Sequence, residues 1–103
     1  MSKIKKITAK KPRQKSKLLI VEGARAFWVH QGPILRSLWD LAKFLEIMTE
    51  EQFVYHTKQH GNDFSRWVSE ILQDKVCANA LIRAKTRPAA LIALGRALTR
   101  YDV

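Results

Sequence analysis

Hydrophobic positions in the middle of the chain recur with the period of an α-helix. Leu38, Leu41, Ala42, Leu45 and Met48 follow the spacing that places side chains on one face of a helix. Further large apolar residues flank this stripe at positions 39, 44 and 47. The pattern therefore predicts a largely buried helix that begins at residue 37 and extends to about residue 48.

The same period marks four more segments, which begin near residues 49, 63, 74 and 88. Their inward-facing positions are, in chain order, Phe53 and His56; Phe64, Trp67, Val68 and Ile71; Val76, Cys77, Ala80, Leu81 and Ala84; and Leu91, Leu94 and Leu98. Two apolar runs of four residues, 18–21 and 26–29, suit short strands by their β-branched and aromatic content. The sequence thus predicts a mainly α fold, a small bundle of four to five helices with one or two short strands near residues 18–30.

Residues that commonly cap helices stand at the boundaries of these segments. Thr49 with Gln52 predicts a capping box, and Ser37 with Asp40 resembles one. Asn62 or Asp63 is expected to cap the third helix, and the others have cap candidates of their own. These are Gly61 as the stop of the second helix, Asp74 as the N-cap of the fourth and Pro88 as the first residue of the fifth.

Charge divides the chain into three regions. The formal net charge is +10 with a pI near 10.2, and residues 1–17 hold eight basic residues and no acidic one. Residues 18–74 hold five basic and eight acidic residues, and residues 75–103 hold six basic and one acidic. A basic segment with little apolar content cannot bury enough surface to offset its ordering entropy. We therefore predict a disordered basic tail over residues 1–17 and a single helical domain over residues 18–103.

Composition excludes several classes of protein. A single cysteine rules out an internal disulfide framework, and no apolar run approaches the ~20 residues of a membrane span. The N-terminus lacks the apolar segment of a secretory signal. These observations predict a soluble, cytoplasmic protein that has no membrane contact and no cofactor.

The middle of the chain resembles an uncharacterised family of small prokaryotic proteins and domains that carry an F-x-x-H…N-D-F-x-x-W signature. The resemblance covers about residues 26–82, and it implies a family but no activity. The signature residues in this chain are Phe53, His56, Asn62, Asp63, Phe64 and Trp67. We interpret them as mainly structural, with the aromatic residues as core anchors.

Three chemical interpretations of this region compete with the structural one. His56 and Asp63 would be the proton-transfer pair of an enzyme, but no third catalytic group is visible in the sequence. His56 and His60 have the spacing of two metal ligands on a helix, and Cys77 would be a third. A glutamate general base is missing between the two histidines, so we predict neither catalysis nor a metal. A helix–turn–helix centred on residues 61–63 is disfavoured because its second helix offers Arg66 but few other base-reading side chains.

The basic termini carry the leading functional prediction. Lysine and arginine neutralise phosphates, and arginine binds them with two parallel hydrogen bonds. We expect a non-enzymatic nucleic-acid-associated protein that contacts the phosphate backbone of RNA, including ribosomal RNA, or of DNA with low sequence specificity. The residues expected to make these contacts are Lys5, Lys6, Lys10, Lys11, Arg13, Lys15, Lys17, Arg83, Lys85, Arg87, Arg96 and Arg100.

Two alternatives stay open at this point. In the first, the acidic and aromatic middle region binds a protein partner and the tail is incidental. In the second, apolar residues of the last helix pack against a second copy of the chain and form a homodimer.

Overall fold

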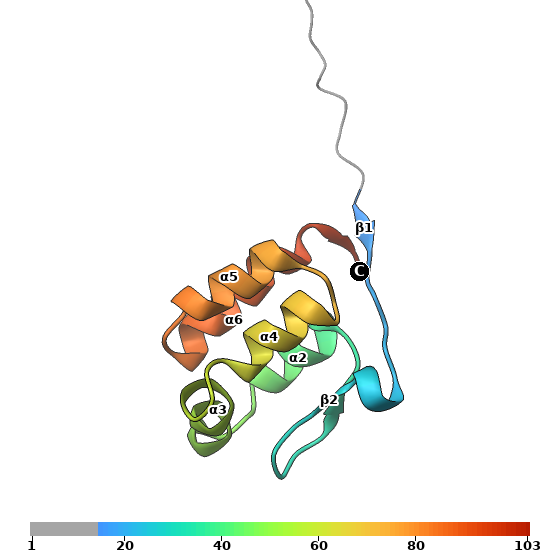
Figure 1. Ribbon diagram of the computed structural model, residues 1–103. Helices are drawn as coiled ribbons and strands as arrows, with labels where there is room; N and C mark the ends of the chain where they lie inside the picture. The colour runs from blue at the N-terminus through green and yellow to red at the C-terminus, as the bar shows by residue number, and fades with distance from the viewer. Residues whose placement is uncertain (1–14) are drawn as a thin grey trace, which may run out of the picture.

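Five α-helices account for most of residues 15–103, which are the residues that the computed structural model describes (Figure 1). This confirms the predicted mainly α fold. The helices are α2 (Leu38–Leu45), α3 (Glu50–Lys58), α4 (Asp63–Glu70), α5 (Lys75–Arg83) and α6 (Arg87–Leu98), and a 3-10 turn, η1, spans Gly23–Arg25. The sequence predicts a disordered tail over residues 1–17, and residues 1–14 of this tail lie outside the part of the chain that the structure describes.

Helices α4 and α5 run side by side in opposite directions, and α6 returns along α5 (Figure 1). Helix α2 packs on the inner side of α6, and α3 is seen end-on in Figure 1, across the start of α4. Two side-chain hydrogen bonds join α4 to α5. The Ser65 hydroxyl donates to the Ala78 carbonyl over 2.8 Å, and the Asn62 amide donates to the Leu81 carbonyl over 3.3 Å.

The N-caps of α2, α3, α4 and α5 lie where the sequence predicts them, whereas α6 begins at Arg87, one residue before the predicted start at Pro88. Thr49 and Gln52 form the full capping box of α3, and Asn62 rather than Asp63 accepts the first free amide of α4. Ser37 caps α2 and Asp74 caps α5. Helix α3 ends three residues before Gly61, and Gly61 (φ +84°) allows the chain to turn into α4.

Four strands of two residues each form two small sheets within residues 15–103. Strand β2 (Phe27–Trp28), which lies in the predicted run 26–29, pairs antiparallel with β3 (Ile34–Leu35). The run 18–21 is extended chain without a strand partner in the structure, although the Val21 amide donates to the Arg36 carbonyl. Strand β1 (Ser16–Lys17) pairs in parallel with β4 (Tyr101–Asp102), so two residues that the sequence assigned to the tail join the C-terminal end of the fold.

The core forms where the inner faces of the five helices meet. Leu41 and Leu45 of α2, Phe64 of α4, Leu81 of α5 and Leu94 of α6 are completely buried or nearly so. Burial of one such side chain contributes roughly 1.5–3 kcal/mol. The helical stripes of the sequence therefore correspond to one continuous core. One inward-facing position was predicted wrongly, because Val76 lies at the start of α5 on its outer side and is 69% exposed. Among the described residues, no helix is long and apolar enough to cross a membrane.

Candidate nucleic-acid interface

A groove between α5 and α6 brings together three of the five predicted C-terminal cations. It has a volume of about 470 Å³, and Arg83, Arg96 and Arg100 line it. Val76 and Ile92 supply apolar surface, and small alanines of both helices complete the lining. None of the described residues that line this groove is acidic. The groove is therefore a cationic channel with an apolar floor.

The local sequence explains how the groove arises. Thr86 caps α6, and Pro88 sits in its first turn, so the chain reverses within three residues after α5. Arg96 lies in the last turn of α6, and Arg100 follows two residues after the helix ends; both line the groove. Arg83 lies in the last turn of α5. The alanine side chains that line the groove between the arginines are small, so the guanidinium groups can extend into water.

Arg100 has a structural partner as well as a place in the groove. Its Nη2 donates to both carboxylate oxygens of Asp74, at 3.2 and 3.0 Å, and the Tyr101 hydroxyl donates to the same carboxylate over 2.6 Å. The Cys77 amide completes the set by donating to Asp74 over 2.9 Å. One nitrogen of the Arg100 guanidinium is committed to this network, and the side chain remains about one third exposed.

The network shifts three pKa values. Burial alone would raise the pKa of Asp74, but the hydrogen bonds from Tyr101, Cys77 and Arg100 outweigh it and lower the pKa. Burial, with the Asp74 carboxylate beside it, raises the pKa of Tyr101. The pKa of the Cys77 thiol rises to about 12, mainly because the thiol is buried. The Cys77 thiol is therefore neutral at physiological pH and lies in the core.

Arg87 also has a structural role. Its Nη1 donates to the Leu45 carbonyl over 2.7 Å, at the C-terminal end of α2. A cation at this position compensates the free carbonyls of the helix end. Arg87 does not line the α5–α6 groove.

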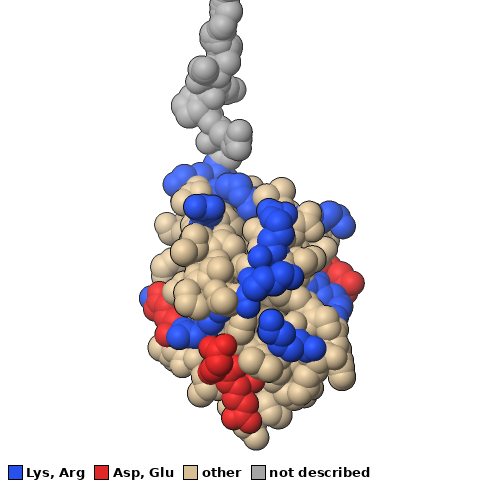
Figure 2. All heavy atoms as spheres, turned by 90° about the vertical axis from the view of Figure 1, so that its left-hand side faces the viewer, with Lys and Arg blue, Asp and Glu red and all other residues tan. Residues whose placement is uncertain are grey.

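The parallel pairing of β1 with β4 places the start of the described chain beside this groove. The Ser16 amide donates to the Arg100 carbonyl over 3.0 Å, so Lys15 and Lys17 emerge next to the end of α6. Both lysines are exposed. In Figure 2, basic side chains run from the top of the molecule to the middle of the visible face, and acidic side chains lie at its left and right edges and in its lower middle. The remaining predicted tail residues, Lys5, Lys6, Lys10, Lys11 and Arg13, lie outside the described part of the chain.

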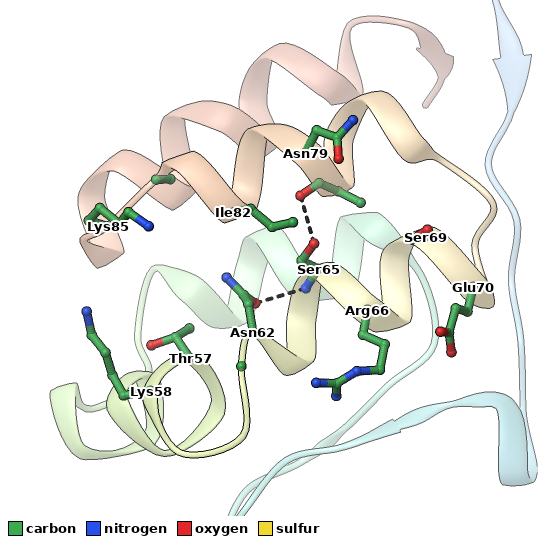
Figure 3. Close-up of a pocket in the computed structure, with 13 residues that line it drawn as sticks. Thr57, Lys58, Asn62, Ser65, Arg66, Ser69, Glu70, Asn79, Ile82 and Lys85 are labelled. Atoms are coloured by element: carbon green, nitrogen blue, oxygen red, sulfur yellow. Dashed lines mark hydrogen bonds between the residues drawn. The ribbon is translucent and has the colours of Figure 1, made fainter.

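Lys85 lies in a second groove, on the other side of α5 (Figure 3). This groove has a volume of about 640 Å³ and lies between the end of α3, α4 and α5. Lys58 approaches from α3 and Lys85 from the turn after α5. Lys58 was missed by the sequence analysis because it stands alone in the acidic middle region. Only the packing of α3 against α4 brings it opposite Lys85.

His56 and Asp63, the pair considered for proton transfer, lie close together in the structure. His56 is 4% exposed, its Nδ1 is 3.0 Å from Asp63 Oδ2, and its Nε2 accepts the His30 amide over 3.0 Å. Because Nε2 accepts a hydrogen bond, the proton sits on Nδ1 and is donated to Asp63. Both nitrogens are engaged within the fold, which leaves none for a substrate. Arg66 holds the other Asp63 oxygen over 2.9 Å.

The signature aromatics lie in the core, as expected. Phe53, Phe64 and Trp67 are buried, and the Phe27 ring of β2 contacts Phe64 and Trp67. The Trp67 indole donates to the Arg25 carbonyl over 2.8 Å and so ties η1 to α4. The signature residues thus hold the β2–β3 hairpin against the helices. No cluster of three or more histidine, cysteine or acidic side chains suitable for a metal occurs within residues 15–103.

Comparison of the chain with protein-family models, with curated proteins and with solved structures gave no match. The function is therefore argued from the chain's own geometry and charge.

Proposed function

We propose that this protein binds nucleic acids through their phosphate backbone and does no catalysis. The observation that carries the proposal is the β1–β4 pairing, which brings Lys15 and Lys17 to the end of the arginine groove. Cations that lie about eighty residues apart in sequence are thereby neighbours on the described surface. A continuous surface of this kind suits a polyanion better than a small ligand, because each neutralised phosphate releases counterions.

The arrangement of the arginines supports a backbone contact. Guanidinium groups bind phosphate oxygens with two parallel hydrogen bonds, and Arg83 and Arg96 have no acidic neighbour among the groove residues. Arg100 and Arg87 contribute to the positive potential while they hold the fold together. A cytoplasmic location stays a prediction.

The test is a salt series on the full-length chain. Anisotropy of a fluorescein-labelled 20-base-pair DNA duplex is measured from about 50 to 200 mM salt, the range in which phosphate contacts lose most of their affinity. The double variant Arg83→Gln/Arg96→Gln is expected to lower the slope of log K against log salt by about 2, since each contact contributes about 0.9. A full-length variant with glutamine at Lys10, Lys11 and Arg13 should lower it by about 3.

A matched control carries the same change in charge. Arg25→Gln/Arg36→Gln removes two exposed arginines that line neither groove. This control should bind like the unmodified chain. If the groove and control variants behave alike, the binding reflects net charge only, and the groove has no part in it.

A protein-binding function is the second candidate, and one feature of α3 favours it. Val54 and Tyr55 are exposed beside Glu50 and Glu51, and together they line a shallow hollow of about 310 Å³. Exposed apolar residues rimmed by acids are typical of a contact surface for a basic protein segment. Lack of any salt-dependent nucleic-acid binding by the full chain would favour this candidate.

A further inference from the structure

Helix α5 lies between the two cationic grooves. Residues 78, 79 and 82 line the groove that faces α4, and residues 76, 77, 80 and 83 line the groove that faces α6. Lys58, Arg66 and Lys85 outnumber one acid, Glu70, along the first groove. Arg83, Arg96 and Arg100 stand along the second groove without an acid among its lining residues. The helix is therefore a ridge with positive charge on both sides.

The outer face of α5 carries large apolar side chains whose exposure is not explained by packing of the core. Val76 is 69% exposed and Ile82 is 50% exposed, although both belong to a helix whose inner face is well packed. Asn79 lies between them, and in Figure 3 no hydrogen bond joins its carboxamide to another residue of the groove. Lys75 and Arg83 mark the two ends of the same face, and both are exposed.

We propose that α5 is inserted into the major groove of double-stranded DNA, with the two cationic grooves receiving the phosphates on either side. This inference rests on the proposed function and adds the form of the nucleic acid and the element that reads it. The charge complementarity is specific to a polymer with two phosphate tracks, because the cations flank α5 on both sides.

The dimensions agree with this arrangement. An α-helix with its side chains is about 10–12 Å across, and the major groove of B-form DNA is about 12 Å wide. The nine residues of α5 span roughly 13 Å. An asparagine carboxamide matches the hydrogen-bonding edge of adenine, and valine and isoleucine side chains contact the thymine methyl group. The middle of the exposed face of α5 therefore offers groups that complement base edges, and Lys75 and Arg83 at its two ends complement phosphates.

The same features disfavour the other forms of nucleic acid. The major groove of A-form RNA is deep and narrow, and side chains cannot read it. Proteins bind single strands by stacking bases on aromatic rings, and neither groove beside α5 contains an aromatic residue among the described positions. Double-stranded RNA and single strands are thus outcomes of the test rather than part of the proposal.

The experiment compares three labelled probes with the full-length chain at about 150 mM salt. The probes are a 20-base-pair DNA duplex of mixed sequence, the RNA duplex of the same sequence and one DNA strand alone. We expect the DNA duplex to bind at least tenfold more tightly than the other two. Val76→Glu should weaken duplex binding at least tenfold, because it places a carboxylate at the base edges, and should change single-strand binding less than twofold.

Dimethyl sulfate footprinting locates the contact. Dimethyl sulfate methylates guanine N7 in the major groove and adenine N3 in the minor groove. We expect the bound protein to protect only guanine N7. Val54→Glu on α3 is the matched control, since it adds the same charge to an exposed position away from both grooves. This control should bind the duplex as the unmodified chain does, and circular dichroism checks that both variants are folded.

The outcomes separate this inference from the proposed function. Equal, salt-dependent binding of all three probes would overturn the insertion of α5 and leave backbone binding in place. Unchanged duplex binding by Val76→Glu, or protection of adenine N3 instead of guanine N7, would also overturn it. Absence of binding to every probe would overturn both.

Discussion

Asp74 is the residue at which the N-terminus of α5 and the C-terminal end of α6 are joined. Its carboxylate caps α5 through the Cys77 amide and accepts hydrogen bonds from Arg100 and Tyr101. A buried carboxylate is stabilised only when its oxygens are satisfied in this way. The same residue therefore fixes the position of Arg100 at the end of the groove.

Asp74→Asn is expected to lower the free energy of unfolding by about 2 kcal/mol at pH 7, because the amide still caps α5 but the charge-assisted bonds are lost. The folded pKa of Asp74 is below its ordinary value of 3.8, so the unfolded chain binds more protons as the pH falls. The stability that Asp74 contributes is present above pH 3.8 and is lost below it. Urea unfolding at a series of pH values measures the effect. The free energies of unfolding of the unmodified chain and of Asp74→Asn should become equal at acid pH.

This account would be contradicted if the difference in free energy of unfolding between the unmodified chain and Asp74→Asn stayed constant from pH 7 to the acid range. A constant difference would mean that the loss comes from packing rather than from the ionised carboxylate.

His56→Ala is expected to lower the free energy of unfolding by about 3 kcal/mol. The substitution removes the acceptor of the partly buried His30 amide, the donor to Asp63 and a ring packed against Phe27. Chemical unfolding measures the effect, and His60→Ala is the control because that residue is exposed. A stable His56→Ala protein with no loss would show that the histidine does not hold the β2–β3 hairpin in place.

Residue-scale features were the most predictable part of the fold. Ser37, Thr49 with Gln52, and Asp74 are caps whose signal lies within three residues of the amide that they accept, so a local pattern identifies them. The roles of Arg87 and Arg100 were not predictable from spacing. Their partners are 42 and 26 residues away in sequence, and only the tertiary fold brings them together.

At the scale of elements, the pairing of β1 with β4 determines where the basic segments meet. Each strand has only two residues, and their pairing joins the two ends of the described chain. No periodicity exists in two residues, so the sequence assigned Ser16 and Lys17 to a tail and left residues 101 and 102 without an element. The helices were predictable because eight to twelve residues contain two or three turns of the pattern.

Ser16→Pro is expected to lower the free energy of unfolding by about 1 kcal/mol, because proline removes the amide that donates to the Arg100 carbonyl. Ser16→Ala keeps the amide and is the matched control, since the serine side chain is exposed. Urea unfolding of the full-length variants measures the difference. An equal effect of both substitutions would show that the strand hydrogen bond contributes nothing.

At the scale of the whole molecule, charge separation was predictable and its arrangement was not. Counting residues locates a basic beginning, an acidic middle and a basic end. The count cannot show that Arg83 and Arg96 share one groove while Lys85 faces Lys58 across another. That difference arises because α5 lies between them, with its two flanks turned toward different neighbours. A homodimer, which the apolar residues of α6 suggested, stays a prediction.

Under the proposed function, the junction of β1 and β4 also makes the affinity for a polyanion and the local order of the chain interdependent. A polyanion that spans the N-terminal segment and the α5–α6 groove is bound best when the two are held together, so it favours the paired state over the opened one. By thermodynamic linkage, a change that weakens the pairing of β1 with β4 also weakens the binding of the polyanion, and the coupling free energy is the same in both directions. Hydrogen exchange at the Ser16 amide, which bonds to the Arg100 carbonyl, would therefore become slower when a polyanion occupies the groove, although this amide does not contact the polyanion.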